Sequence, residues 1–385
     1  MLDAMDFLLF TFAVVPIQKE FALSRATMGA LTSVALVAGA AGGIVFGSLA
    51  DRIGRVRAMT ISILIYSLAT AGLATATSLA QLVAWRLLVG IGMGGEWSSG
   101  SALVAESWPA RHRAKAMGIM QSGWAIGAML AAALAAVGLE RFGWRALFLV
   151  GALPALAAFF IRRNVEEPRL WRERIATTEP QSAPVVRIFR RDLIGRVVVA
   201  SLLASSVLVA FWGVITWLPA FLATPLSEGG AGLTLTRSAL WTFVLQLGAF
   251  AGYVSFGWLA DRFGRRPSFT AFMLAATIVV PLFAFGARSP WTLLLVGPLV
   301  GYFCHGYFSI FGALIAELFP TAVRATALGF CYNVGRLASA AAPLAIGAAS
   351  KSHGLGSAIA VDALFFLAGA MLIWLLPETR GRELT

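Results

Sequence analysis

Apolar residues along this chain gather in long blocks that short polar stretches separate. Each block holds roughly 17–25 residues, the length that an α-helix needs to cross about 30 Å of hydrocarbon. Backbone amides in lipid must bond within their own segment, so we expect these blocks to be helices. The pattern predicts twelve spans, near residues 1–18, 26–50, 58–77, 79–104, 113–137, 144–162, 196–221, 237–260, 268–286, 291–316, 323–347 and 356–376.

The composition agrees with a membrane protein. The 385 residues are 59% hydrophobic and 12% charged, against about 25% charged residues in soluble domains. The net charge of +12 does not indicate nucleic acid, because the basic residues lie in short loops between apolar blocks. Cys304 and Cys331 have no metal or disulfide spacing, and no phosphate-binding loop occurs. We therefore expect no enzyme activity, no metal or other cofactor, and neither nucleotide nor nucleic acid as a partner.

The two halves of the chain repeat each other. The motif Gly-x-Leu-Ala-Asp-Arg-x-Gly-Arg occurs at 47–55 and again at 257–265, and the segment 106–113 recurs at 317–324, with offsets of 210 and 211. Parallel repeats of six spans are a known transporter layout, with the binding site between the halves. The sequence predicts an all-α membrane protein with a six-helix bundle at 1–162, a cytoplasmic linker at 163–195 and a second six-helix bundle at 196–385.

The basic residues also predict the orientation. If the two repeated motif loops face the cytoplasm, the cytoplasmic segments carry 21 Lys and Arg residues and the opposite loops carry 7. Cytoplasmic loops of membrane proteins carry the excess of positive charge. We therefore expect a multi-pass protein of the inner (plasma) membrane with both termini in the cytoplasm.

The repeated motif resembles the signature loop of the major facilitator superfamily. The Arg86–Gly94 stretch and Pro377–Arg382 agree with this resemblance, which covers the whole chain. Leu2–Phe7, Gly92–Trp97 and Tyr332–Arg336 are similar to the sialate/monocarboxylate:proton symporter branch. The resemblance implies a secondary active transporter that takes up a small organic anion with protons by alternating access. Span 5 lacks the Gly-Pro element of the family's proton antiporters, which favours symport.

Other functions stay open at this stage. One is a carrier of another metabolite, such as an aromatic acid or a sugar, and another is an exporter. A third, of a different class, is a membrane nutrient sensor that does not transport. The first span reaches Pro16 after about 16 residues, fewer than the ~20 of a full span, so we also expect Met1 to lie inside span 1.

Ionisable residues inside spans are costly unless they are paired or face water, so they mark functional sites. Arg336 lies 12 residues after Arg324, about 18 Å into its span, and its guanidinium fits a carboxylate. Asn333 lies one turn earlier and is a second candidate for substrate binding. The alternative for Arg336 is a structural ion pair with Glu96 or an aspartate. Trp97 and Gln121 are candidates for the cavity wall, with buried bulk as the alternative for Trp97.

Four residues are candidates for proton coupling. Glu96 lies about 15 Å deep and takes a proton if an occupied Arg336 no longer attracts it; the alternative is a permanent hydrogen bond between helices. Asp3 and Asp6 share one face in the cytoplasmic third of span 1, with an entrance charge as the alternative. For Arg86 the resemblance implies proton handling, and snorkelling to the outer surface is the alternative.

The repeated motifs supply the gating candidates. The resemblance implies that Asp51 meets the N-terminus of span 11 in the outward-open state, and that Asp261 meets span 5 near Arg113. The alternative is that these loops only fix the orientation. The stripe Ala35, Gly39, Gly43 and Gly47 predicts close helix packing along span 2. The full set of gating candidates is Asp51, Arg52, Arg55, Glu106, Arg113, Asp261, Arg262, Arg265, Glu317 and Arg324.

The topology can be tested by labelling single cysteines with a reagent that does not cross the membrane. We expect the variants Pro180→Cys and Lys351→Cys to react from opposite sides, because the first lies in the linker and the second in an outer loop. Reaction from the same side would contradict the twelve-span arrangement.

Overall fold

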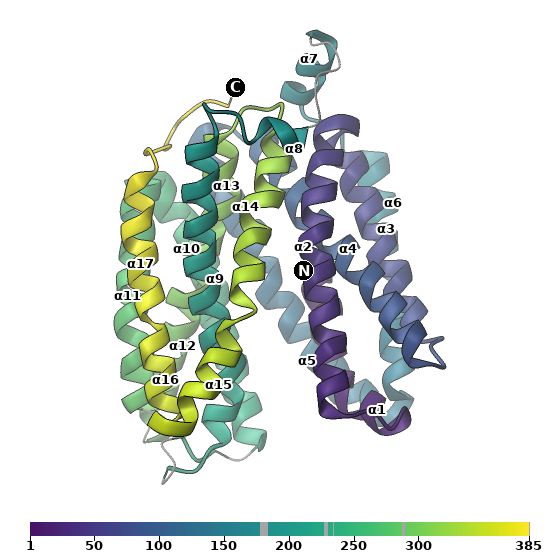
Figure 1. Ribbon diagram of the computed structural model, residues 1–385, viewed down its shortest axis with the longest axis vertical. Helices are drawn as coiled ribbons and strands as arrows, with labels where there is room; N and C mark the ends of the chain where they lie inside the picture. Colours follow the sequence, from purple (N-terminus) through teal and green to yellow (C-terminus); the bar gives the residue numbers. More distant parts are fainter. Residues whose placement is uncertain (178–183, 227–229, 234, 287–288, 385) are drawn as a thin grey trace.

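The expected spans are helices in the computed structural model of the protein. It describes residues 1–385 except 178–183, 227–229, 234, 287–288 and 385, and Figure 1 shows helices throughout that part. The first bundle contains α1 (Leu2–Glu20), α2 (Arg25–Ile53), α3 (Arg55–Leu73), α4 (Leu79–Ser107), the short 3-10 helix η1 (Ala110–His112), α5 (Arg113–Val150) and α6 (Pro154–Asn164). Gly143, with φ at 73°, kinks α5 and separates span 5 from span 6.

The second bundle follows two short linker helices. These are α7 (Arg169–Thr177) and α8 (Pro184–Arg187), while residues 178–183 of the expected linker, including position 180, lie outside the described residues. The helices after the linker are α9 (Ile194–Ala223), α10 (Leu235–Phe263), α11 (Arg265–Gly286), α12 (Pro290–Gly306), α13 (Phe308–Leu318), α14 (Arg324–Ser339), α15 (Ala342–His353), α16 (Leu355–Asp362), α17 (Leu364–Leu372) and η3 (Ile373–Leu375). Each of spans 10, 11 and 12 is therefore built from consecutive helical pieces.

Nine helical stretches in the described part of the chain are long and apolar enough to cross a membrane. The three other expected spans are α1, α4 and the pair α14–α15. Charged residues interrupt α1 and α4, and span 11 is broken between Ser339 and Ala342. The three expected spans outside these nine are thus those that carry Asp3, Glu96 and Arg336.

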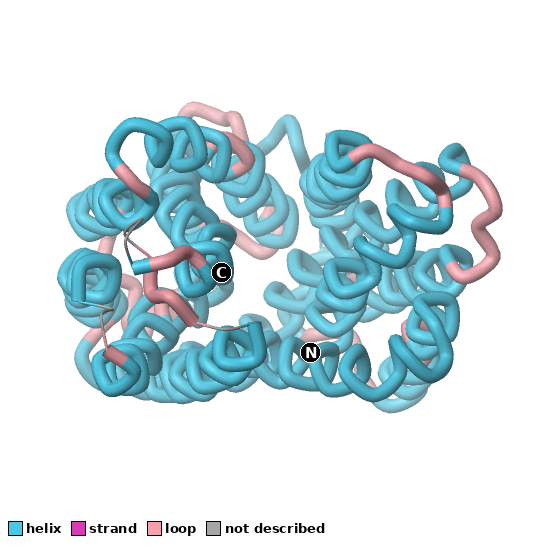
Figure 2. Tube along the Cα trace, turned by 90° about the horizontal axis from the view of Figure 1, so that it is seen from below, coloured by secondary structure: helices cyan, strands magenta, loops and turns pink. Residues whose placement is uncertain are grey.

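The helices form two groups that lie side by side. Figure 1 shows α2 to α6 on one side and α9 to α17 on the other, and Figure 2 shows the same two groups along the perpendicular direction. The linker helices α7 and α8 and the C-terminal segment lie together at one end of the molecule, which we call the linker end. The domain boundaries expected from the sequence stay a prediction.

Glycines bring α2 close to both groups, as the small-residue stripe predicts. A methyl group on Gly94 of α4 would overlap the Gly39 carbonyl, and one on Gly47 would overlap the Ala325 carbonyl of α14. Lipid supplies no hydrophobic force between helices, so such close backbone contact is a main source of their association. Helix α2 therefore packs against its own group and against the second one.

Candidate functional site: a central cavity and a closed end

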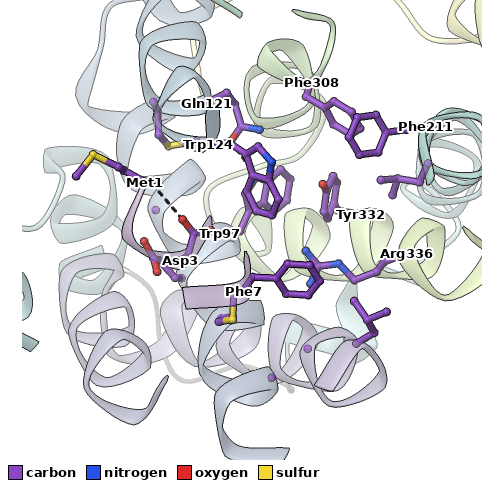
Figure 3. A pocket seen from close by; sticks show the side chains of 18 of the residues that line it. Met1, Asp3, Phe7, Trp97, Gln121, Trp124, Phe211, Phe308, Tyr332 and Arg336 are labelled. Atoms are coloured by element: carbon purple, nitrogen blue, oxygen red, sulfur yellow. Dashed lines mark hydrogen bonds and ion pairs between the residues drawn. The ribbon is translucent and has the colours of Figure 1, made fainter. Parts of the chain in front are cut away.

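A cavity of about 300 Å³ lies between the two groups of helices. Its wall is mostly apolar and one third of its residues are aromatic, several of which Figure 3 shows around the cavity. Residues of the first group come from α1 to α5, and those of the second group come from α9, α10, α13 and α14. Its aromatic members are Phe7, Trp97, Trp124, Phe211, Trp212, Tyr253, Phe308 and Tyr332.

Arg336 lines this cavity from α14, in the second group. Its guanidinium carbon lies 5.5 Å from the centroid of the Tyr332 ring. Gly39 faces it, and the lack of a side chain there leaves room for the guanidinium. No acid among the described residues forms an ion pair with Arg336, so the alternative of a permanent pair with Glu96 does not apply to this conformation.

Trp97 and Gln121 also line the cavity, as expected. The indole N–H of Trp97 donates a hydrogen bond to Gln121 Oε1 at 3.3 Å. The Trp97 ring stacks on Tyr332 of the other group with centroids 3.9 Å apart. Sequence reasoning missed Tyr332, although it stands at the offset of 211 from Gln121. Gln121 and Tyr332, the two residues that contact Trp97, therefore occupy equivalent positions in the two halves of the repeat.

Two acids line the cavity from the first group, Glu96 on α4 and Asp3 on α1. Glu96 Oε2 is buried and has no hydrogen-bond partner among the described residues, and the Tyr66 hydroxyl lies near this carboxyl. Asp3 accepts a hydrogen bond from the amino group of Met1 at 3.1 Å. Among the described residues, Asp3 thus forms a salt bridge with the Met1 amino group, while Glu96 forms none.

The expected depth of Asp3 and Asp6 is wrong. Met1 packs against Gly123 and Gly127 in the first half of α5, and the N-terminus lies at mid-height in Figure 1, not at the linker end. Asp3 is therefore level with the cavity. Asp6 is only 2% exposed, beside Thr70, and lies behind the wall with no hydrogen-bond partner among the described residues.

Two other candidates lie away from the cavity wall. Arg86 is 1% exposed, and its guanidinium carbon lies 3.8 Å from the Phe10 ring centroid, so it does not snorkel to the outer surface. Asn333 is buried between α14 and α2, where it packs against Gly43 and donates to the Gly329 carbonyl at 2.7 Å. The structure therefore does not bring Asn333 together with Arg336, and in this conformation it packs the helix interface.

The contacts expected for Asp51 and Asp261 are present. Asp51 accepts hydrogen bonds from the backbone N–H groups of Ala325 and Thr326, at 3.2 and 2.9 Å. Asp261 accepts them from Ala114 and Lys115, at 3.3 and 2.9 Å. Both acids therefore bind the positive N-terminus of a helix in the other group.

Four buried ion pairs join the same regions. Glu106 binds Arg55 of its own group and Arg324 of the other, at 2.9 and 2.7 Å. Glu317 binds Arg265 of its own group at 2.9 Å and Arg113 of the other at 2.8 Å. We call these six residues, with Asp51 and Asp261, the inner network. It joins the two groups at the linker end.

Arg52 and Arg262 are not part of this network. Both side chains are exposed, and the guanidinium of Arg262 lies 5.1 Å from the Trp258 ring centroid. Their exposed position fits the alternative that these two residues only fix the orientation of the protein in the membrane. The gating candidates thus divide into buried residues that join the two groups and surface residues that do not.

Two carboxylates that sequence reasoning missed support the network from outside. Glu167 accepts hydrogen bonds from the backbone N–H groups of Arg55, Val56 and Arg57 at the start of α3. Glu378 does the same for Arg265 and Arg266 at the start of α11. Burial acts to raise the pKa of Glu378, but its backbone hydrogen bonds hold that pKa below the usual value. The offset of 211 between these two acids was the available signal.

Known proteins give the family of the chain. The Major Facilitator Superfamily matches residues 1–243 and 221–385. A "Putative metabolite transport protein" of Haemophilus influenzae is 36% identical, over 100% of this chain and 95% of the relative. The "Probable 4-methylmuconolactone transporter" of Cupriavidus pinatubonensis is 34% identical, over 99% of this chain and 88% of the relative. The "Cis,cis-muconate transport protein" of Acinetobacter baylyi is 32% identical, over 96% and 90%.

A solved structure agrees on the fold. The proton:xylose symporter XylE superposes with a TM-score of 0.82 at 20% identity, covering 100% of this chain and 94% of that one. At this identity the likeness concerns the fold alone. The family match and the relatives confirm the family expected from the sequence motifs. The chain belongs to the Major Facilitator Superfamily, and it is a multi-pass membrane protein of a transporter family, not an enzyme.

Proposed function

We propose that this protein takes up a small organic anion together with protons, and that Arg336 binds the carboxylate. The observation that carries the proposal is an arginine without an acidic partner among the described residues, in a mostly apolar cavity between the two groups. A buried guanidinium is stabilised by a planar carboxylate that accepts two parallel hydrogen bonds. One relative is named for cis,cis-muconate, an organic anion, which supports this substrate class.

The aromatic wall favours a flat, unsaturated acid over a sugar. Trp97 and Tyr332 line the cavity as a stacked pair, and aromatic side chains pack well against a conjugated substrate. Besides Gln121 and the ionisable residues, the hydrogen-bonding groups of the wall are the N–H groups of its tryptophans and the hydroxyls of its tyrosines. The ring surface around them offers the many hydroxyls of a sugar no partner, and it favours a flat, conjugated frame.

Glu96 is the coupling acid in this proposal. It shares the cavity with the bound anion, whereas Asp6 and Arg86 lie behind the wall. A charged Glu96 and a bound carboxylate repel each other, so the anion binds best when Glu96 holds a proton. The carrier with both anion and proton then has balanced charge in its cavity and can reorient, while partly loaded forms keep an uncompensated charge in low dielectric.

The inner network is the cytoplasmic gate in this proposal. Its members lie at the linker end, and the excess of basic residues there indicates the cytoplasm. Because the network joins the two groups at that end, the conformation is closed toward the cytoplasm. Release of the substrate requires that Asp51 leave α14 and that Asp261 leave α5. The C-terminal segment lies at this end, so it is at the cytoplasmic face in this proposal, whereas Met1, expected there from the sequence, lies level with the cavity.

The anchor is tested by Arg336→Lys. This change keeps the charge but loses the paired donors, so we expect at least about a tenfold weaker apparent affinity for a labelled organic acid in proteoliposomes. The exposed Arg262→Lys serves as the control and should transport normally. If Arg336→Ala carried the acid with unchanged affinity, the anchor would be wrong and a neutral substrate would be indicated.

The coupling acid is tested by Glu96→Gln. Exchange of labelled for unlabelled acid should persist, because it needs no net proton movement, while an imposed pH gradient should no longer drive accumulation. Glu166→Gln, an exposed acid of the linker, is the matched control. Accumulation by Glu96→Gln that still follows the pH gradient would shift the coupling role to another acid.

The gate is tested by Asp51→Asn, which removes the charge that holds the N-terminus of α14. We expect slower net uptake with expression and equilibrium substrate affinity largely intact, because the cavity is untouched. The exposed linker residue supplies the control Asp192→Asn. An unchanged uptake rate in Asp51→Asn would contradict the gating role and leave only the alternative that this loop fixes the orientation.

A further inference from the structure

A further buried acid lies in the second group, behind the cavity wall. Asp362 is the last residue of α16, is 5% exposed and does not line the cavity. Its carboxyl group lies against Gly213 of α9, where a methyl group would overlap it. Asp362 Oδ2 is buried and has no hydrogen-bond partner among the described residues. The proposed transport mechanism gives this acid no role.

The helices around Asp362 bring no described cation to it. Helix α16 packs against α9, α11, α15 and α17, of which Figure 1 shows the arrangement. Asp362 is the one ionisable residue of α16, and α17 contains none. The ionisable residues of the other three helices lie at helix ends: Arg196 near the start of α9, Arg265 and Arg266 at the start of α11, and Lys351 and His353 beside Gly354, at the opposite end of α16 from Asp362.

The polar groups that approach Asp362 from α12 and its end are neutral ones. A charge on Asp362 would act on Cys304 and Tyr307. The Tyr307 hydroxyl is also buried without a partner among the described residues. His305, next to Cys304, is hydrogen-bonded through Nδ1 to the Gly301 carbonyl at 3.0 Å. An ionised Asp362 would therefore find a hydroxyl and a thiol nearby, but no positive charge.

An ionised carboxylate is unfavourable at this place for two reasons. Taking an isolated carboxylate out of water is costly, and a buried acid avoids the cost by keeping its proton. Asp362 also ends α16, and the last carbonyl groups of a helix carry partial negative charge. Ends of broken helices in transporters bind Na⁺ or protons for this reason. With one carboxyl group and no further acid among the described neighbours, a proton fits this site better than a metal ion.

The first group contains the same arrangement with the partners exchanged. Asp6 on span 1 lies against Gly151 on span 6, whereas Gly213 on span 7 lies against Asp362 on span 12. Gly151 stands 211 residues before Asp362, the offset of the repeat. Each group thus has a buried carboxyl group between its first and last span, with a glycine that makes room for it.

We propose that Asp362 is a proton-binding site of the second group, separate from the coupling acid, and that its neutral form holds α9 and α16 together. When Asp362 loses its proton, the carboxylate has to reach water, and this requires that α9 and α16 separate. Gly213 directly follows Trp212, which lines the cavity, so the separation reaches the cavity wall. Transport therefore falls at alkaline pH even without a pH gradient. This last step rests on the proposed function, whereas the proton site itself does not.

Infrared spectroscopy of the purified full-length chain tests the site without a substrate. We expect the spectrum of the unmodified chain minus that of Asp362→Asn, at neutral pH, to contain the C=O stretching band of a protonated carboxyl group. The control is Asp192→Asn, which replaces an exposed acid of the linker and should give the bands of an ionised carboxylate instead. Ionised carboxylate bands in the Asp362→Asn difference spectrum would overturn the proposal.

Thermal unfolding of the same samples gives a second readout. The folded chain binds a proton at Asp362 that a hydrated carboxyl group has lost at neutral pH, so this site lowers the stability as the pH rises. Between about pH 6 and about pH 9, we expect the Tm of the unmodified chain to fall relative to that of Asp362→Asn by about 2 °C or more. Asp192→Asn should follow the unmodified chain. A constant difference between Asp362→Asn and the unmodified chain would indicate a structural residue that does not titrate, and would overturn the proposal.

Two further arms cover the remaining outcomes. If Asp362→Asn does not fold, Asp6→Asn prepared with isotope-labelled aspartate should still show an isotope-shifted band of a protonated carboxyl group, and its absence would overturn the proposal. Stabilisation of the unmodified chain by Na⁺, absent in Asp362→Asn, would assign the site to a metal cation and overturn it as well. None of these results depends on Arg336 or on substrate binding, so the proposed function stands or fails separately.

Discussion

The carboxylate of Glu106 is held at once by Arg55 of its own group and by Arg324 of the other, and all three side chains are fully buried. Charges in such a place must be paired, because an isolated ion out of water costs several kcal/mol. The pairing brings the start of α14 against the end of α4 and the start of α3, and beside it Asp51 ties the end of α2 to the same helix start. From there the glycines of α2 keep α2 and α14 in contact up to Gly39, which lies against Arg336. The position of the candidate anchor thus depends on ion pairs twelve residues away.

Much of this arrangement follows from the sequence. Apolar block lengths predict the spans, because lipid leaves the backbone no other way to satisfy its amides. The repeat predicts two similar groups. Block lengths and repeats depend on composition and on chain position, which a single sequence displays directly. The contacts of Asp51 and Asp261 with helix N-termini, which the structure contains, were implied by the family resemblance of the motif loops.

Side-chain direction within a span is harder to predict. Asn333 and Arg336 are three residues apart and share a helix face in sequence terms, yet one packs into the helix interface and the other lines the cavity. The two side chains point about 60° apart around the helix axis. This difference is enough for Asn333 to fill the space that Gly43 leaves and for Arg336 to point into the cavity. The depth of Asp3 was missed for a related reason, since it depends on which part of α5 accepts Met1. Tyr332 and Glu167, in contrast, were visible in the repeat offset.

An end closed by ion pairs has a thermodynamic consequence that an end closed by apolar contacts would lack. When the groups separate, the arginines and carboxylates of the inner network regain their hydration, and this recovers much of the Coulomb energy that is lost. An apolar contact of the same area would stabilise only the closed state, and separating the two surfaces would cost the full free energy of their transfer to water. Salt links between the halves therefore keep the two end states of the carrier close in free energy, so that the modest binding energy of one small ligand is enough to tip the balance.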